Sequence, residues 1–577
     1  MKRKIKRRFM MKGKLKLFLA VGAISVIVAG CANANSQNGM KGTDQPKMNM
    51  GDSQQNTSQN KEQSGDMKLT QATPVADGKE FTITAQASNL KVSDDVTLPV
   101  WTFNNSVPGP QIRVKVGDTV KVKLKNELEE PVSIHWHGYP VPNNMDGIPG
   151  VTQDAVAAGK EFTYEFKATV PGTYWYHSHQ DSVNQLDKGL YGTLIVEDPS
   201  ESYDRDYTIV LDEWMSSGEM DMSNNEDMEG MDHSQMDMGD TSNNEDMQGM
   251  DHSQMDMGNT SNNEDMEGMD HSQMDMGDTS NMTEMAGHDM SMYDVYTMNG
   301  KTGDAIDKLT VKKGDKVRIR LVNAGYITHT IHLHGHEFKV IASDGQPVNS
   351  PAVITDQGIA IAPGERYDLE FTANNPGSWL LEEHGKEDRV KNMRAVIEYE
   401  GVPDRPDASN ANEELPTFDL TKYGQQARTN FSLDQKFDQD VKLDLNTEMK
   451  AGEMVYTING KLFPDTDPIK VDKGDKVKVT FVNNSKTDDH PMHLHGHFFQ
   501  VLSKNGKPLE GTPVIKDTLN VKPGEEYVVA FEADNPGDWM FHCHDLHHAS
   551  AGMVTDVMYN GYNSNYTPDP TVGNKPE

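Results

Sequence analysis

Short segments in which apolar and polar residues alternate recur along the chain, and this is the period of half-buried β-strands. The clearest segments span residues 120–124, 317–321 and 477–481. Turns of the Gly-Asp and Pro-Gly type separate such segments, and no long helical period is present. The pattern predicts an all-β protein made of antiparallel strands.

Three blocks of the chain are copies of one unit, because the same motifs return in the same order. A Gly-Asp-x-Val motif begins at residues 117, 314 and 474. A His-x-His-Gly motif follows at 135, 332 and 493, and a Pro-Gly-x-aromatic motif at 171, 376 and 536. The second and third copies stay in register at an offset of 160 to 161 residues. We therefore expect three β-sandwich domains, over residues 71–200, 201–400 and 401–577.

The composition is unusual in one segment. The chain has 577 residues, 35 methionines, 2 cysteines and a net charge of −35. Residues 216–292 hold 18 of the methionines and 20 acidic residues, without Lys, Arg, Val, Ile, Leu or aromatic residues. Such a segment cannot bury a core, so it is expected to be a disordered insert in the second domain. The acidity argues against a nucleic-acid partner. Two cysteines exclude a disulfide-stapled or iron–sulfur protein.

The N-terminus has the pattern of an export signal. A basic segment precedes an apolar run over residues 17–30, which fits a signal peptide and is short for a membrane-spanning helix. The run ends in Val-Ala-Gly-Cys31, which resembles a bacterial lipobox, so residues 1–31 are predicted to be a lipoprotein signal peptide with Cys31 lipidated. The alternative is an ordinary cleavage site beside a chance cysteine. Residues 32–70 are predicted to be a flexible tether, which would leave the mature protein extracytoplasmic and anchored to the cell membrane.

The third copy carries a dense group of possible copper ligands. A single thiolate with two imidazoles and a weak thioether is the ligand set of a blue copper site. His490, Cys543, His548 and Met553 supply this set, three of them from one loop. Further histidines form His-x-His pairs at 135/137, 177/179, 493/495 and 542/544. Residues i and i+2 of a strand point to the same face, so each pair can bind metal on one side.

The motifs HWHG, WYHSH, HPMHLHGHFF and HCHDLHHASAGM resemble the copper signatures of the multicopper oxidases, and the resemblance covers all three repeats. It implies three cupredoxin-like Greek-key domains and four copper ions, one of type 1, one of type 2 and two of type 3. The type 1 copper would take the four residues named above. The type 2 copper would take His135 and His493, one type 3 copper His137, His177 and His544, and its partner His179, His495 and His542.

The resemblance also implies a mechanism. Substrate would give up single electrons at the type 1 site, and Cys543, bonded to His542 and His544, would pass them to a three-copper cluster between the first and third domains. Dioxygen would be reduced to water there. Asp146 stands where bacterial relatives carry a proton-shuttling acid, which makes it a candidate catalytic residue beside Cys543; the alternative is a simple turn residue. Some relatives have an acid directly after the second type 1 histidine, but this chain has Ala549, so that proton route lacks its acid.

The second copy has lost the thiolate. Its histidines at 329, 332 and 334 keep the spacing of the third copy. Glu382 and Glu383 stand where the third copy has a histidine and the cysteine, and Asp388 replaces the second type 1 histidine. This copy therefore cannot form a blue copper site. Its residues are either structural or form an auxiliary site for a harder metal.

The methionine-rich insert contains a 19-residue unit that occurs three times between residues 223 and 279. Thioethers are soft ligands that favour Cu(I), and acidic neighbours raise the local concentration of cations. The candidate Cu(I)-capturing residues are one histidine and two methionines per repeat: His233, Met236 and Met238; His252, Met255 and Met257; His271, Met274 and Met276. A solvated linker lengthened by repeat slippage is the alternative.

These patterns favour an extracytoplasmic multicopper oxidase that converts Cu(I) to Cu(II) with dioxygen in copper tolerance. The expected partners are Cu(I) or another reducing substrate, dioxygen, and a membrane through the lipid anchor. Two alternatives are a laccase or ferroxidase of broad substrate range and a non-enzymatic copper-sequestering lipoprotein. The complete ligand set argues against the sequestering protein, since vestigial sites would be expected to have lost a histidine.

Overall fold

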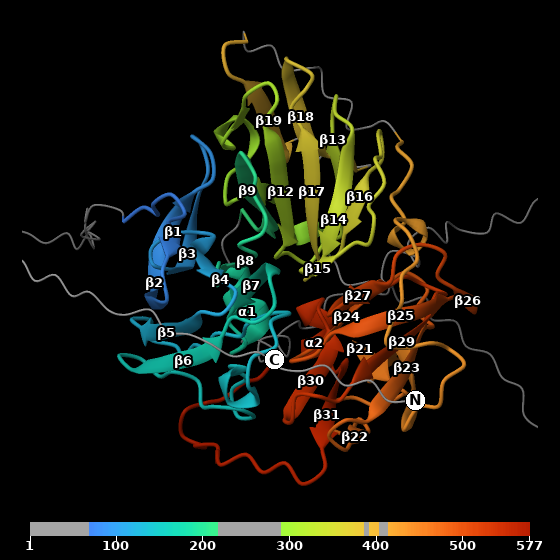
Figure 1. Ribbon diagram of the computed structural model, residues 1–577. Helices are drawn as coiled ribbons and strands as arrows, with labels where there is room; N and C mark the ends of the chain where they lie inside the picture. Colours follow the sequence, from blue (N-terminus) through green and yellow to red (C-terminus); the bar gives the residue numbers. More distant parts are fainter. Residues whose placement is uncertain (1–67, 217–289, 386–391, 403–413) are drawn as a thin grey trace, which may run out of the picture. The chain divides into compact units, whose positions relative to one another are not determined.

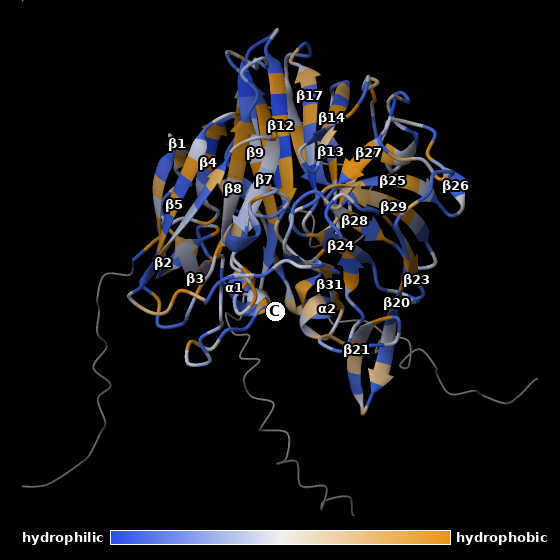
Figure 2. Ribbon diagram, turned by 60° about the horizontal axis from the view of Figure 1, so that its bottom comes forward, coloured by the Kyte–Doolittle hydropathy of each residue, from blue (hydrophilic) through white to orange (hydrophobic). Residues whose placement is uncertain are grey.

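The predicted strands are present in the structure, a computed structural model that describes residues 68–216, 290–385, 392–402 and 414–577. The alternating segments of the three repeats lie within β5 (Thr119–Asn126), β12 (Lys316–Asn323) and β23 (Lys476–Asn483). Strands dominate the described residues, which confirms the all-β prediction. Hydrophilic and hydrophobic residues alternate along strands such as β12 and β17 (Arg366–Thr372) in Figure 2.

The first cupredoxin-like sandwich packs two four-stranded sheets over a core that includes Ile83, Val122 and Leu194. One sheet has the order β3 (Thr97–Phe103), β2 (Glu80–Lys91), β5 and β6 (Glu161–Lys167). The other has the order β1 (Val75–Asp77), β4 (Gly109–Lys115), β8 (Tyr191–Glu197) and β7 (Gly172–His177). A short helix, α1 (Ser182–Asp187), lies between β7 and β8.

The second sandwich begins with the strands that flank the methionine-rich insert. Its larger sheet has the order β10 (Val295–Met298), β9 (Arg205–Trp214), β12, β17, β14 (Phe338–Ser343) and β15 (Gln346–Pro347). Its other sheet has the order β11 (Leu309–Val311), β19 (Arg394–Tyr399), β18 (Ser378–Glu383), β13 (His329–Leu333) and β16 (Ile359–Ile361). Strands β9 and β10 pair antiparallel with Trp214 opposite Val295. The strands that precede and follow the insert, called its two stems below, are therefore neighbours.

The third sandwich repeats the strand order of the second. Its larger sheet has the order β21 (Glu453–Ile458), β20 (Gln439–Lys450), β23, β29 (Glu526–Glu532), β25 (Phe499–Lys504) and β26 (Lys507–Pro508), and β27 (Val514–Lys516) also pairs with β25. Its other sheet has the order β22 (Ile469–Val471), β31 (Val554–Tyr559), β30 (Asp538–Cys543), β24 (His490–Leu494) and β28 (Thr518–Val521). A short helix, α2 (Leu546–Ser550), follows β30 and contacts α1 (Figure 1).

Buried charges join the three sandwiches. Arg320 of β12 is 1% exposed; it donates to the carboxylates of Asp206 and Asp368 and, across the domain boundary, to the hydroxyl of Thr173 in β7. Arg366 of β17 donates to the carbonyl of Thr173 in the first sandwich and forms two 2.7 Å hydrogen bonds to Asp517 of the third. The guanidinium of Arg366 therefore binds groups from both neighbouring domains.

Several predicted features fall outside the described residues. These are the signal peptide with Cys31, most of the tether, Asp388, and the repeat residues His233, Met236, Met238, His252, Met255, Met257, His271, Met274 and Met276. Among the described residues, no helix combines the length and the apolar character that crossing a membrane requires. The anchoring and capture hypotheses therefore stay predictions.

The buried pairs at Arg320 predict a strong effect of removing its charge. Arg320→Met leaves the buried carboxylate of Asp368 and the partly buried carboxylate of Asp206 without one of their cations, so it should lower the free energy of unfolding by about 3–5 kcal/mol. Arg205→Met is the matched control, because the Arg205 side chain is 31% exposed and its ion pairs should contribute less than about 1 kcal/mol. Chemical denaturation of the full chain measures both effects. Equal shifts for the two variants would contradict the structural role of Arg320.

Candidate metal centres

Three potential ligand atoms converge where β24 and β30 lie side by side. Sγ of Cys543 is 3.8 Å from Nδ1 of His490 and 3.5 Å from Nδ1 of His548. The two nitrogens are 3.3 Å apart. The centre of this triangle lies about 2 Å from each atom, which is the length of a metal–ligand bond. Met553 is fully buried beside it, and its backbone pairs with both Cys543 and His548.

The outer nitrogen of each histidine in this group is held by another side chain. Nε2 of His490 hydrogen-bonds the Ser485 hydroxyl at 2.7 Å, and Nε2 of His548 lies 3.3 Å from a carboxylate oxygen of Asp545. Asp545 also caps α2 by accepting from the amide of His547. Such contacts fix the orientation of the rings with Nδ1 toward the thiol. Burial raises the pKa of the Cys543 thiol well above its ordinary value, and only a bound cation would stabilise the thiolate in this position.

Eight buried histidines from the first and third sandwiches form a second, larger centre. Within each of three groups, two of which share His137, the ligand atoms lie within 4.8 Å of one another. The groups are His135, His137 and His493; His137, His177 and His544; and His179, His495 and His542. The structure thus brings together all eight histidines that the His-x-His pairs contain.

Strand alternation separates this centre from the first one. In the pairing of β24 with β30, His493 lies opposite His542, and Met492 lies opposite Cys543. Neighbouring residues of a strand point to opposite faces, so His542 faces the histidine cluster and Cys543 faces the other way. In the first sandwich, His135 and His177 form a β-bridge that places their rings at the same cluster.

The ring nitrogens have the pattern that metal ligands require. Most outer nitrogens donate to backbone carbonyls: Nδ1 of His135 to Asp146, of His177 to Ser178, of His493 to Asp517 and of His542 to Cys543. The opposite nitrogens then carry lone pairs. The buried atoms without a hydrogen-bond partner include Nε2 of His135, His177, His179 and His493, Nδ1 of His137 and both ring nitrogens of His544. Leaving such atoms unpaired is costly, and imidazole is a good ligand for copper, so the donor set fits a copper cluster.

Electrostatics favour the neutral form of several of these rings. Burial, and then the neighbouring imidazoles, lower the pKa values of His177, His495, His542 and His544 well below the ordinary range. A neutral imidazole is the form that binds a metal ion. At His493 burial also lowers the pKa, although the nearby carboxylate of Asp517 acts in the opposite direction.

The structure places Asp146 directly against the cluster. It follows η1 (Asn143–Met145) and is 1% exposed. One carboxylate oxygen accepts from Nδ1 of His495 at 3.0 Å, and the other lies 3.2 Å from Nδ1 of His135. Asp146 therefore orients one histidine from the first sandwich and one from the third.

The sequence motifs do not identify every residue that contacts the cluster. Thr518 hydrogen-bonds Nε2 of His137, and Asp517 beside it is buried. Burial alone would raise the pKa of Asp517, but Arg366 outweighs this effect and holds the pKa below its usual range. These residues bear no local motif, because their partners lie in other domains.

The segment that ends in Glu577 was also missed. The carbonyl of Pro576 accepts from Nδ1 of His179, and Oε1 of Glu577 lies 3.6 Å from Nε2 of His179 and 3.6 Å from Nδ1 of His542. Burial raises the pKa of Glu577 to about 8. A carboxyl group thus lies beside the cluster although the position after the second type 1 histidine holds an alanine.

Comparison with known proteins agrees with this fold and these centres. Models of multicopper oxidase domains match residues 84–201, 205–402 and 434–561. The chain is 30% identical over 502 residues to the multicopper oxidase MmcO of Mycobacterium tuberculosis, covering 83% of this chain and 86% of that protein. It is 24% identical to a copper resistance protein A homolog of Pseudomonas syringae pv. tomato, covering 83% and 92%. The crystal structure of a laccase from Botrytis aclada superposes with a TM-score of 0.63 at 22% identity, covering 87% and 92%.

The chain belongs to the multicopper oxidases, a family of oxidoreductases. Members bind four copper ions, one of type 1, one of type 2 and two of type 3. The predicted family, fold class, enzyme class and copper complement are therefore confirmed.

A glycine of the second sandwich touches the cluster and gives a prediction. Gly364 has φ +82°, and a Cβ atom there would lie 2.9 Å from Cγ of His544 and 3.0 Å from Cε1 of His137. Gly364→Ala should displace these rings and lower copper retention at the cluster or turnover by about 10–100-fold, with the blue absorption retained. The matched control is Gly314→Ala, with φ +97° and no atom within 4 Å, which adds backbone strain alone. Equal copper content and turnover in the two variants would contradict this contact.

Proposed function

We propose that this protein is a cuprous oxidase that converts Cu(I) to Cu(II) and passes the electrons to dioxygen, as part of copper tolerance. The observation that carries this proposal is the position of the described residues that flank the methionine-rich insert in the sequence. The two stems of the insert pack against helix α2, which holds the type 1 ligand His548. A relative named copper resistance protein A homolog supports the same physiological role.

The stems of the insert are joined to each other and to α2. The amide and hydroxyl of Ser216 donate to the carboxylate of Asp294 at 2.7 and 2.5 Å. Trp214, at the end of the first stem, and Tyr293, just before the second, share one hydrophobic cluster with Leu546 of α2. Met215 and Met290 pack at the edge of this cluster. Ligands carried by the insert would therefore be joined to the described chain beside the type 1 centre.

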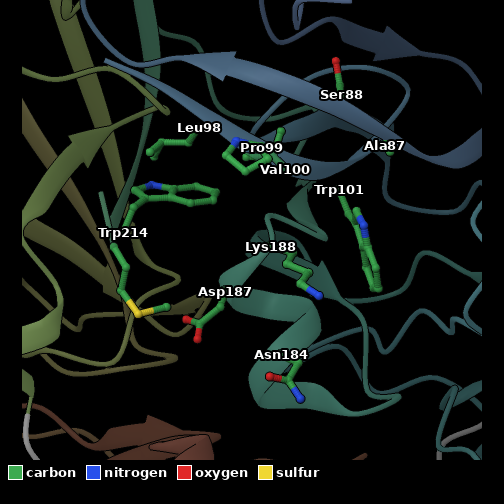
Figure 3. Close-up of a pocket in the computed structure, with 11 residues that line it drawn as sticks. Ala87, Ser88, Leu98, Pro99, Val100, Trp101, Asn184, Asp187, Lys188 and Trp214 are labelled. Atoms are coloured by element: carbon green, nitrogen blue, oxygen red, sulfur yellow. The ribbon is translucent and has the colours of Figure 1, made fainter. Parts of the chain in front are cut away.

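A pocket of about 190 Å³ opens at the same stem (Figure 3). Its lining includes Met215, which provides a thioether, and Asp187, which provides a carboxylate. Figure 3 shows the side chain of Lys188 between Asp187 and the indole ring of Trp101, and Lys188 Nζ lies 4.3 Å from the centre of that ring. Burial raises the pKa of Asp187 to about 7, and Lys188 also lines the pocket, so the feature that favours Cu(I) there is the soft thioether of Met215.

Polar contacts connect this pocket to the type 1 centre. The hydroxyl of Tyr293 donates to Asp187 at 3.0 Å and lies 3.4 Å from Nε2 of His547. His547 is bonded directly to His548 in α2. The pocket and the thiolate site are therefore linked by a short series of hydrogen-bonded and covalently bonded groups.

The protein groups have distinct tasks in the proposed reaction. His490, Cys543, His548 and Met553 would hold a copper that supplies one-electron acceptance, and the eight cluster histidines would hold the coppers that supply the chemistry of dioxygen reduction. Cys543 joins the two centres, because its peptide neighbours His542 and His544 both face the cluster. Asp146 orients the cluster rings, and its carboxyl group and that of Glu577 lie where dioxygen reduction consumes protons.

Oxygen uptake with Cu(I), Fe(II) and a phenol tests the proposal on the copper-loaded protein. A deletion of residues 217–289, closed by a short Gly-Ser linker between the neighbouring stems, should lower kcat/KM for Cu(I) by at least about tenfold, because a captured ion no longer reaches the type 1 centre at high local concentration. Phenol oxidation should not change. A second variant keeps the length and the charge of the insert but replaces the repeat methionines by glutamine. It should show the same selective loss of Cu(I) oxidation.

Other outcomes favour the other functions. Unchanged Cu(I) turnover after deletion would contradict the capture role of the insert. Faster turnover with Fe(II) or a phenol than with Cu(I) would point to a ferroxidase or a laccase. Absence of oxygen uptake with all three substrates would point to a copper-sequestering protein.

A further inference from the structure

A second group of metal-ligating side chains lies in the second sandwich, separate from the copper ligands described above. His332 is in β13 and Glu382 is in β18, directly opposite each other in the antiparallel pairing. His334 and His384 follow these two strands by one residue. The ligand atoms of the three histidines lie within 4.8 Å of one another.

This group is the counterpart of the cluster histidines of the third sandwich. His493 lies opposite His542 in the same register as His332 opposite Glu382. In the third sandwich, the first sandwich supplies the remaining ligands across the domain boundary. In the second sandwich, the corresponding four side chains instead turn toward one another.

Four of the distances within the group are close to those of a tetrahedral site. Nε2 of His384 is 3.3 Å from Nδ1 of His332 and 3.3 Å from Nε2 of His334. Oε1 of Glu382 is 2.9 Å from Nε2 of His334 and 3.7 Å from Nε2 of His384. Tetrahedral ligands at the usual metal–nitrogen bond length are about 3.3 Å apart. The four atoms therefore surround a space of the size of one metal ion.

Burial and charge also favour a cation there. His332, His334 and Glu382 are 3%, 5% and 1% exposed. Burial and the two neighbouring imidazoles lower the pKa of His332 to about 3, so its ring is neutral and carries a lone pair. A metal ion shared by buried nitrogens that face each other stabilises their lone pairs more than one shared proton does.

The neighbouring His329 shows the contrast. Its Nδ1 contacts Glu383 at 2.5 Å and its Nε2 contacts Glu213 at 3.2 Å. Burial lowers the pKa of His329, but Glu383 and Glu213 outweigh it and raise the pKa to about 10. The position that corresponds to the type 1 centre is thus occupied by a buried ion pair, and only the position that corresponds to the cluster has converging lone pairs.

We propose that the second sandwich binds one divalent transition-metal ion, Zn²⁺ or Cu²⁺, in addition to the four coppers, with these ligands: His332, His334, Glu382 and His384. Three imidazoles and a carboxylate suit these two ions, and the absence of a thioether or thiolate among the four disfavours Cu(I). The ion clamps β13 to β18 at the end of the sheet.

The number of metal ions bound per chain, measured on the full, copper-loaded protein, tests this site. After incubation with Zn²⁺ or, in a separate arm, with additional Cu²⁺, and removal of loosely bound metal, the wild-type protein should hold one ion per chain more than His332→Gln or Glu382→Gln. The blue absorption and phenol oxidation of both variants should equal those of the wild type. The arm that fills the site identifies the ion, and a Cu²⁺ ion there adds a paramagnetic signal with nitrogen couplings.

His336→Gln is the matched control. Both ring nitrogens of His336 are already hydrogen-bonded, one to the hydroxyl of Tyr399 at 2.7 Å and one to the carbonyl of His334 at 2.9 Å, so this variant should keep the additional ion. Wild-type protein that takes up no additional ion in either arm overturns the proposal, whatever the variants do. Variants that hold as many ions as the wild type overturn the assignment of these ligands.

Discussion

Two metal centres depend on the alternation of side chains along a single strand. Successive residues of β30 point to opposite faces, so His542 and Cys543 serve different centres although one peptide bond joins them. His544 returns to the face of His542. The opposite strand repeats the arrangement, with Met492 on the thiolate side and His493 on the cluster side. A slip of one residue in the pairing would exchange the two faces and abolish both centres at once.

The second constraint is the junction between domains, because the larger cluster needs ligands from two of them. Arg366 of the second sandwich stabilises this junction by binding the Thr173 carbonyl and the Asp517 carboxylate. The backbone carbonyl of Asp517 accepts from a cluster histidine, His493. The second sandwich thus positions the cluster without supplying a copper ligand to it. A buried ion pair is a costly way to gain stability, but it fixes a unique geometry at a site where small displacements matter.

The repeated motifs predicted three sandwiches and singled out the histidines that the structure brings together, because strand alternation and ligand spacing are local properties of the chain. Contacts between distant segments could not be predicted in this way. Asp517 meets Arg366 across 151 residues, and the carbonyl of Pro576 meets His179 across 397 residues. His384 is different, since it repeats the position of His544 at the offset of 160 residues and could have been found by extending the alignment of the copies by one residue.

In the proposed reaction, electrons reach the cluster through Cys543. The most direct measurement compares the visible spectrum, the copper content and the oxygen uptake of copper-loaded wild type and Cys543→Ser. Cys543→Ser should lose the blue absorption, retain the three cluster coppers, and take up oxygen only at background level with Cu(I). Oxygen uptake by Cys543→Ser at the wild-type rate, with the cluster intact, would contradict this route through Cys543.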